Sequence, residues 1–143
     1  KPLLTNLNGR MVRSAPNYSA GFSNYWRCNY TSTVSYITTL SNSASIVEVK
    51  IILFNNNTGN IETKTFTSGG TNTLESSYYQ SSSGAANNST ESANAYINAI
   101  SHSKYAGENF TIQVRDSDNV WSEVYNGTIV IQPWVLLICS FQC

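Results

Sequence analysis

Alternation of apolar and polar residues is the feature that most limits how this chain can fold. In residues 32–40, Val34 and Tyr36 fall on one side of an extended backbone, and Thr33 and Ser35 fall on the other. Successive side chains of a β-strand point to opposite faces, so this period of two predicts a half-buried strand. The pattern recurs along the chain, which restricts the fold to one built mainly of β-sheet.

Two further runs extend the pattern. Residues 46–54 alternate in the same way, and the polar run 55–60 that follows predicts a hairpin to a strand at 61–67. Residues 110–114 alternate again before the polar residues 116–119, which predict a turn. Because short turns join antiparallel neighbours, most of the sheet is expected to be antiparallel.

Three more strands are expected near the end of the chain. Residues 120–125 and 128–131 flank Asn126-Gly127. Asn-Gly between β-type runs predicts a hairpin, because its type I′ turn needs two positive φ angles. Residues 134–141 form an apolar run that is typical of a strand buried on both faces and is too short to span a bilayer.

One segment has the period of a helix instead. The apolar residues at positions 93, 96, 97 and 100 lie one helical turn apart. Asn88 is a favourable N-cap with Glu91 three residues later, and Gly107 can end the helix. We therefore expect one amphipathic helix over residues 89–105.

Residues 67–90 show the least pattern. They are dominated by Ser, Gly, Asn and Thr, and their large anchors are Leu74 and the pair Tyr78-Tyr79. Unstructured loops of this length are uncommon in compact domains and tend to be functional. We expect a long surface loop here, with at most a short strand around Tyr78.

Together these elements predict a single domain over residues 1–143, an antiparallel β-sandwich with one helix. Residues 107–123, with the sequence GENFTIQVRDSDNVWSE, resemble the penultimate strand and following turn of extracellular immunoglobulin-like and fibronectin type III-like modules. The resemblance covers 17 of the 143 residues and implies an immunoglobulin/fibronectin-like topology. The chain departs from those modules in the helix before this strand and in its continuation to residue 143.

Charge excludes two classes of function. Eight basic and eight acidic residues give no net charge, so the chain lacks the positive field of a nucleic-acid or anionic-membrane binder. Charged residues make up 11% of the chain, against about a quarter of a typical domain. Ser, Thr, Asn and Tyr supply the polar surface instead, which suits neutral partners. We expect no nucleic-acid partner and no membrane span.

The cysteines leave two readings open. Cys28, Cys139 and Cys143 are odd in number, so the arithmetic default is one disulfide and one free thiol. A bridge from Cys28 to either of the others would close most of the chain into a loop and stabilise it. The alternative is three reduced, buried thiols that pack as small apolar groups.

Processing and modification signals point outside the cell. The chain opens at Lys1 with no charged segment followed by an apolar one, and we interpret it as a mature chain. Seven Asn-x-Ser/Thr sequons, at positions 17, 29, 56, 87, 88, 109 and 126, fit a glycoprotein, although not all seven are expected to be occupied. We expect a secreted or cell-surface protein.

The sequence predicts no catalytic site. Its single histidine, His102, falls on the expected helix without the nucleophile and orienting group that catalysis needs. Asp116 and Asp118 resemble the start of an oxygen-ligand calcium loop, but a turn closed by the same side chains explains them equally. We expect a non-enzymatic protein without a cofactor, with calcium at Asp116 and Asp118 as an open alternative.

Aromatic residues combine with hydrogen-bonding side chains in three segments that we expect to be loops. A pyranose has an apolar C–H face that stacks on a ring, and hydroxyls that amides, carboxylates and guanidinium groups bind. The competing interpretation is that each ring is a core residue. The expected ligand-binding residues are Asn24, Tyr25, Trp26 and Arg27 in the first segment, Tyr78, Tyr79 and Gln80 in the second, and Asp116, Asp118, Asn119 and Trp121 in the third.

These features predict a lectin or adhesion module that binds neutral glycans or glycoproteins, with weak sites combined in a homo-oligomer. Two other classes stay open. A toxin or pore-forming protein would rearrange residues 32–40 and 61–77 into a membrane hairpin. A pilus, coat or capsid subunit would assemble through the apolar C-terminal strand. Dye leakage from liposomes would identify the toxin, and concentration-dependent growth of large assemblies would identify the subunit.

Overall fold

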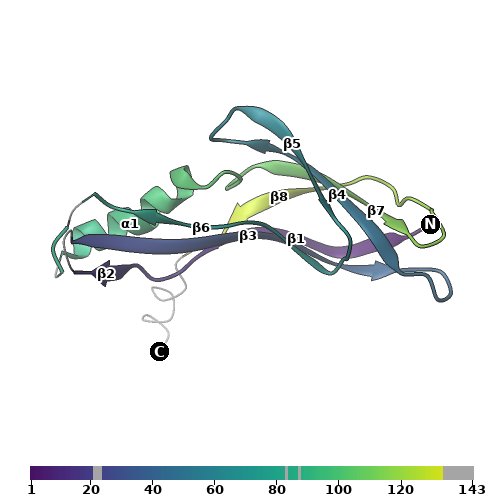
Figure 1. Ribbon diagram of the computed structural model, residues 1–143, viewed down its shortest axis with the longest axis horizontal. Helices are drawn as coiled ribbons and strands as arrows, with labels where there is room; N and C mark the ends of the chain where they lie inside the picture. Colours follow the sequence, from purple (N-terminus) through teal and green to yellow (C-terminus); the bar gives the residue numbers. More distant parts are fainter. Residues whose placement is uncertain (21–23, 83, 87, 134–143) are drawn as a thin grey trace.

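The computed structural model describes residues 1–20, 24–82, 84–86 and 88–133. Over these residues the chain is mainly β with one helix, which confirms the expected fold class. The sandwich and immunoglobulin-like topologies stay predictions. In chain order the elements are β1 (Leu3–Arg13), β2 (Asn17–Ser19), β3 (Tyr25–Thr39), β4 (Ile46–Asn55), β5 (Asn60–Phe66), β6 (Thr71–Gln80), α1 (Ser89–His102), β7 (Asn109–Asp116) and β8 (Tyr125–Ile131) (Figure 1).

The strands pair in the order β2–β3–β1–β8–β7–β4–β5. Strand β6 lies outside this order and pairs with β3. The ladders are antiparallel except for that between β1 and β8, which is parallel. The strands described form one hydrogen-bonded sheet, and the β1–β8 ladder joins its two parts. We call the part made of β1, β2, β3 and β6 the long sheet, and the part made of β4, β5, β7 and β8 the crossing sheet. In Figure 1 the long sheet runs along the molecule, the crossing sheet lies over one part of it, and α1 lies alongside another.

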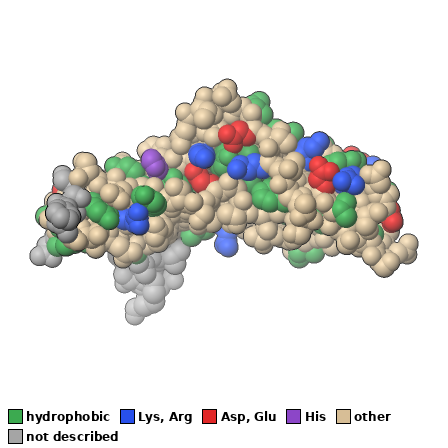
Figure 2. Space-filling model, viewed as in Figure 1, with side chains coloured by type: hydrophobic (Ala, Val, Ile, Leu, Met, Phe, Trp, Pro, Cys, Tyr) green, Lys and Arg blue, Asp and Glu red, His purple; other side chains and the backbone are tan. Residues whose placement is uncertain are grey.

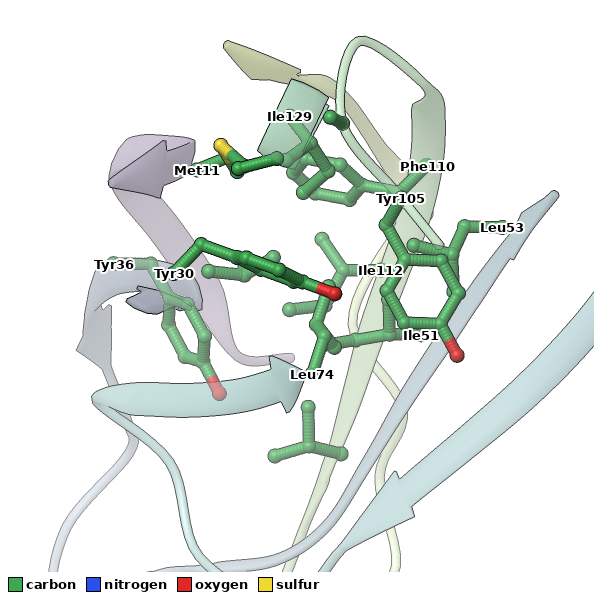
Figure 3. Packing of buried hydrophobic residues seen from close by; sticks show 14 of the residues in the cluster. Met11, Tyr30, Tyr36, Ile51, Leu53, Leu74, Tyr105, Phe110, Ile112 and Ile129 are labelled. Carbon is green, nitrogen blue, oxygen red and sulfur yellow. The ribbon is translucent and has the colours of Figure 1, made fainter. Parts of the chain in front are cut away.

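The core lies on the inner face of the long sheet. Alternate residues of β3, including Tyr30 and Val34, are buried there. At one end they meet α1, and at the other they meet buried residues of the crossing sheet such as Ile51 and Ile112. Figure 3 shows Tyr30 of the long sheet converging with Ile51 and Ile112 of the crossing sheet. Each fully buried large apolar side chain contributes roughly 1.5–3 kcal/mol, so this interface holds the two sheets together.

The expected surface loop at 67–90 is wrong over residues 71–80, which form strand β6. This strand pairs with β3 from Arg27↔Gln80 to Ser35↔Thr71. The register shifts between Ser32 and Thr33, and the neighbours Leu74 and Glu75 are both buried as a result. This irregularity interrupts the period of two, so the sequence pattern of a strand is hidden.

The expected hairpin at Asn126-Gly127 is also wrong, because both residues lie inside β8. They pair with Thr111 and Phe110 of β7. A Cβ atom on Gly127 would come within 2.4 Å of the Phe110 ring, and one on Gly9 of β1 within 2.5 Å of the same ring. The glycine is therefore required by close packing rather than by a turn. Of the strand expected at 120–125, Trp121 forms only an isolated bridge to Arg115.

The first thirty residues contain strands that the pattern did not predict. β1 runs beside β3, but its register shifts between Thr5 and Asn8, and Asn6 has a φ of 54°. The resulting bulge breaks the alternation. The Trp26 segment, expected to be a loop, is the first part of β3.

The helix begins where the sequence predicts and ends earlier. The Asn88 side chain accepts hydrogen bonds from the backbone N–H groups of Thr90 and Glu91, which confirms the N-cap. The helix ends at His102 rather than residue 105, because Tyr105 turns into the core and is 1% exposed. Within the described ranges, no helix is both long enough and apolar enough to cross a membrane.

Two predictions cannot be compared with the structure. The apolar run 134–141 lies outside the described residues, as do Cys139 and Cys143. Cys28 is buried, and its thiol is free of any disulfide to a described residue. Burial raises the pKa of the Cys28 thiol, which favours its protonated, unreactive form.

Candidate functional site

The ladder between β3 and β6 brings the first two predicted clusters together. Arg27 lies directly opposite Gln80, and Asn29 lies opposite Tyr78. On the other edge of β3, Asn17 of β2 lies opposite Arg27. Directly paired residues point to the same side of a sheet, so all five side chains share the outer face of the long sheet. We call these five residues the Tyr78 patch.

Arg27 and Tyr78 form a stacked pair at the centre of this patch. The guanidinium carbon of Arg27 lies 3.6 Å from the centre of the Tyr78 ring. Tyr78 nevertheless keeps 44% of its surface exposed, and Asn17, Asn29 and Gln80 are exposed around it. The Arg27 guanidinium donates no hydrogen bond to another described residue. Its Nε atom is buried, so the donors available to a ligand are those of the two terminal nitrogens.

Trp26 and Tyr79 lie on the opposite, inner face. The indole Nε1 of Trp26 donates to the carbonyl of Ala85 at 3.1 Å, and its ring packs edge-on against Tyr18 at 5.3 Å. Tyr79 packs edge-on against His102 at 5.6 Å. Trp26 therefore contacts the segment before α1, and Tyr79 contacts α1 itself, so both rings pack the end of the long sheet against its neighbours. Of the remaining first-cluster residues, Tyr25 pairs with Ser19 and Asn24 lies just before β3.

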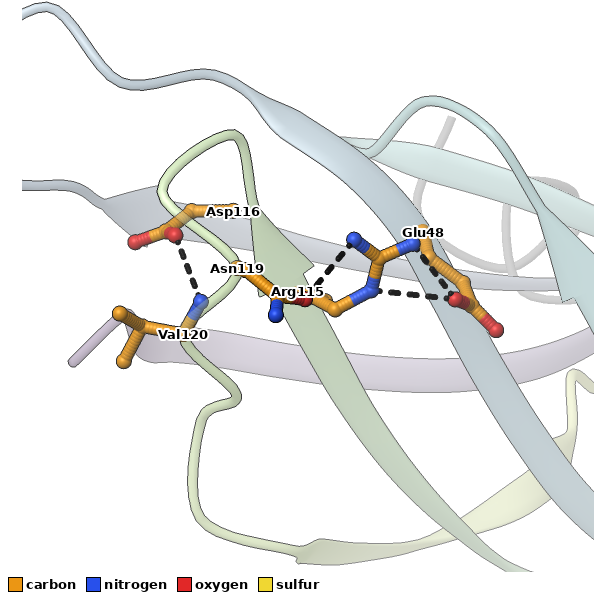
Figure 4. Close-up of polar contacts among 5 residues, drawn as sticks. All are labelled: Glu48, Arg115, Asp116, Asn119 and Val120. Atoms are coloured by element: carbon orange, nitrogen blue, oxygen red, sulfur yellow. Dashed lines mark hydrogen bonds and ion pairs between the residues drawn. The ribbon is translucent and has the colours of Figure 1, made fainter.

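The third predicted cluster lies elsewhere, at the end of β7. Asp116 is 3% exposed. Its Oδ1 accepts hydrogen bonds from the backbone N–H of Asp118 at 2.9 Å and from that of Val120 at 3.0 Å, the second of which is drawn in Figure 4. Asn119, with a φ of 64°, completes the turn and accepts a bond from Arg115. The turn predicted at 116–119 is therefore confirmed, and its side chains close it.

Trp121 follows this turn and is half-buried between cations. Lys50 Nζ lies 5.1 Å and the Arg115 guanidinium carbon 5.7 Å from the indole ring. Arg115 also forms an ion pair with Glu48 at 3.0 Å. The Trp121 ring thus already contacts two cationic side chains of this protein.

The described residues contain no preformed metal-binding site. No group of three His, Cys, Asp or Glu side chains there is arranged to hold an ion. Asp116 directs one carboxylate oxygen at two backbone donors, and Asp118 is exposed. Calcium at these two residues stays a prediction.

A buried polar network ties the segment after α1 to the sheets. Tyr105 donates a short hydrogen bond to Glu62, and Asn55 donates to the same carboxylate at 2.8 Å. These two donors hold the pKa of Glu62 below its usual range. Nearby, Glu75 accepts bonds from the Ser103 hydroxyl and the Lys104 backbone. The carboxylates of Glu62 and Glu75 therefore both accept hydrogen bonds that connect parts of the fold.

The structure also contains a groove that sequence reasoning missed. It occupies about 650 Å³ on the crossing sheet and is lined by β4, β5, β7 and β8. Phe54 and Ile61 form one wall, and Asn109, Asn126 and Thr128 form the other. We call it the Phe54 groove. The groove is lined from four strands, so no single stretch of sequence reveals it. The one local signal is on the outward side of β4, where the apolar residues Ile52 and Phe54 follow Lys50.

Comparisons with known proteins identified no relative of this chain. No protein-family model, curated protein or solved structure matches the chain.

Proposed function

We propose that this protein is a non-enzymatic, secreted or cell-surface carbohydrate-binding protein, and that the Tyr78 patch is its binding site. The observation that carries the proposal is the β3–β6 register, which places Arg27 beside Tyr78 and Gln80 although about fifty residues separate Arg27 from these two in sequence. Two segments selected independently for sugar-binding chemistry meet at one exposed surface.

The chemistry of the patch suits a pyranose. The exposed ring of Tyr78 offers an apolar surface for the C–H face of a sugar. Gln80, Asn17 and Asn29 carry amides that both donate and accept hydrogen bonds, and Arg27 adds further donors. A sugar hydroxyl likewise donates and accepts, so paired contacts with these groups are available around the ring.

The surroundings of the patch favour a neutral ligand. Ser, Thr and Asn cover most of the remaining outer face of the long sheet, through residues such as Thr31, Thr33 and Ser35. Figure 2 shows that Lys, Arg, Asp and Glu side chains cover only a minor part of the visible face of the molecule. Binding of this kind is expected to be weak at one site and to gain strength through multiple copies.

The test is binding of the purified protein to a broad panel of immobilised glycans. The protein should be produced without N-glycans, because Asn17 and Asn29 both begin sequons and an attached glycan would cover the patch. We expect selective binding that Tyr78→Ala and Arg27→Ala each reduce at least tenfold. Ile37→Ala is the matched control, since Ile37 is 55% exposed on the same strand but lies outside the patch.

Two results would contradict the proposal. One is that no glycan binds the wild-type protein. The other is that binding survives both Tyr78→Ala and Arg27→Ala while circular dichroism shows both variants folded, which would place the site elsewhere.

A further inference from the structure

The Phe54 groove lies on a different surface from the Tyr78 patch. Its side chains project from the outer face of the crossing sheet, whereas the patch is on the outer face of the long sheet. The two sites share no residue. An inference about the groove therefore stands on its own geometry and does not depend on the patch.

One wall of the groove is apolar. Phe54 of β4 lies directly opposite Ile61 of β5, and their exposed fractions are 38% and 73%. Ile52 lies two residues before Phe54 and lines the same wall. Single exposed apolar residues are common, but Phe54 and Ile61 lie side by side next to the half-buried Ile52, and together they form an apolar surface.

The facing wall is polar. Asn109 of β7 lies directly opposite Thr128 of β8, and the Thr128 hydroxyl donates to the Asn109 amide oxygen at 2.8 Å. This bond orients the Asn109 amide and leaves its NH₂ group to donate. Asn126 lies on the same wall, and its side chain makes no hydrogen bond to another described residue.

The floor of the groove is rigid. Phe110 packs beneath Gly127 so closely that a Cβ atom at Gly127 would lie 2.4 Å from the ring. Phe110 itself is 2% exposed and belongs to the core. Strands β7 and β8, which carry the polar wall, therefore pack closely on the core, and this wall is preformed.

We propose that the Phe54 groove is a second binding site, for a neutral sugar with one apolar face. The groove residues include no lysine or arginine and a single acid, Glu108, so nothing in the lining attracts an anionic ligand. A pyranose would place its C–H face on Phe54 and Ile61 and its hydroxyls against Asn109 and Asn126. With the Tyr78 patch on another sheet, one chain would then cross-link two glycan strands.

The experiment is an NMR titration of isotopically labelled protein, made without N-glycans, with cellotriose and chitotriose as probes. We expect saturable shifts of the backbone amides of Phe54, Asn109 and Gly127. Phe54→Ala and Asn126→Ala should each raise the dissociation constant at the groove at least tenfold, while Tyr78→Ala leaves it unchanged. Val130→Ala is the matched control, since Val130 is 50% exposed on β8 but does not line the groove.

The outcomes separate the two sites. Shifts confined to the Tyr78 patch would overturn the groove proposal and leave the proposed function standing. Shifts confined to the groove would support the groove proposal and contradict the patch. If neither probe shifts any amide, the groove proposal fails, and the glycan panel decides the patch. If the groove amides broaden with protein concentration and without sugar, the groove is a contact between two copies of the chain, and the proposal fails.

Discussion

Two arginine–tyrosine stacks, one on each face of the long sheet, have the same geometry and different environments. Arg13 lies 3.7 Å from the centre of the Tyr96 ring, and Arg27 lies 3.6 Å from that of Tyr78. Tyr96 is 6% exposed, whereas Tyr78 is 44% exposed. Arg13 also donates at 2.9 Å to the carbonyls of Tyr96 and Gln132.

The inner stack stabilises the packing of three parts of the fold. Arg13 connects β1 to α1 and to the residue after β8, and its terminal nitrogens are both occupied. The outer stack connects only neighbouring strands, and its guanidinium donors face no acceptor among the described residues. We therefore expect an arginine stacked on a tyrosine to contribute to binding only where its terminal donors are unused, as in the proposed Tyr78 patch.

The largest expected effect is that of Trp26→Ala on the inner face. The substitution removes a half-buried ring and its hydrogen bond to Ala85, so we expect the free energy of unfolding to fall by about 3 kcal/mol. Denaturant unfolding followed by circular dichroism measures this change. Tyr78→Ala on the outer face should cost less than about 0.5 kcal/mol. Equal losses in the two variants would break the distinction between the faces.

The two arginines provide a closer comparison. Arg13→Ala removes two charge-assisted hydrogen bonds, and we expect it to destabilise the fold by about 2 kcal/mol without affecting glycan binding. Arg27→Ala should change stability by less than about 0.5 kcal/mol and reduce binding at the Tyr78 patch at least tenfold. Unfolding and glycan binding are to be measured on both variants. A large stability loss in Arg27→Ala would show that the outer stack is structural too.

A smaller loss of stability than in Trp26→Ala or Arg13→Ala is expected at Tyr36, which is buried on the inner face of β3. Its hydroxyl donates to Asn72 at 2.7 Å, so Tyr36→Phe should cost about 1 kcal/mol. Burial raises the pKa of Tyr36 to about 12 from an ordinary value of 10.0. Because the folded pKa is raised, the stability contributed by protonated Tyr36 is complete below pH 10 and is lost as the pH rises from 10 to about 12.

Unfolding midpoints measured from pH 8 to 12 test this assignment. The wild-type midpoint should fall through the interval above pH 10, and the fall should be shallower in Tyr36→Phe. Parallel curves would mean that Tyr36 does not contribute to the alkaline loss of stability. Tyr105→Phe offers a second comparison, since burial and the adjacent Glu62 also raise the pKa of Tyr105.

Much of the fold could be predicted where the signal is local. The hairpin of β4 and β5, the N-cap at Asn88 and the turn at 116–119 each depend on residues a few positions apart. Strand β6 could not be predicted, because its irregular register with β3 hides the alternation. Asn126-Gly127 was misinterpreted because the ring that requires Gly127 lies seventeen residues earlier, at Phe110.

The candidate site was predictable only in part. Composition and clustering selected Arg27, Tyr78 and Gln80, but they selected Trp26 and Tyr79 equally. Asn17 joins the patch through β2, a strand of three residues with no recognisable pattern. The Phe54 groove was missed because its two walls come from four strands that meet only in the folded sheet.

The sequence by itself determined that this chain forms β-strands, where its helix starts and that its surface is nearly uncharged, because these properties depend on side-chain chemistry and on spacing of a few residues. Only the tertiary structure decided which aromatic rings are exposed. Trp26 and Arg27 are adjacent in sequence but point to opposite faces of β3, and α1 and the preceding segment cover only one of those faces. The physical reason is that strand alternation separates neighbours, whereas long-range pairing chooses which side becomes the core.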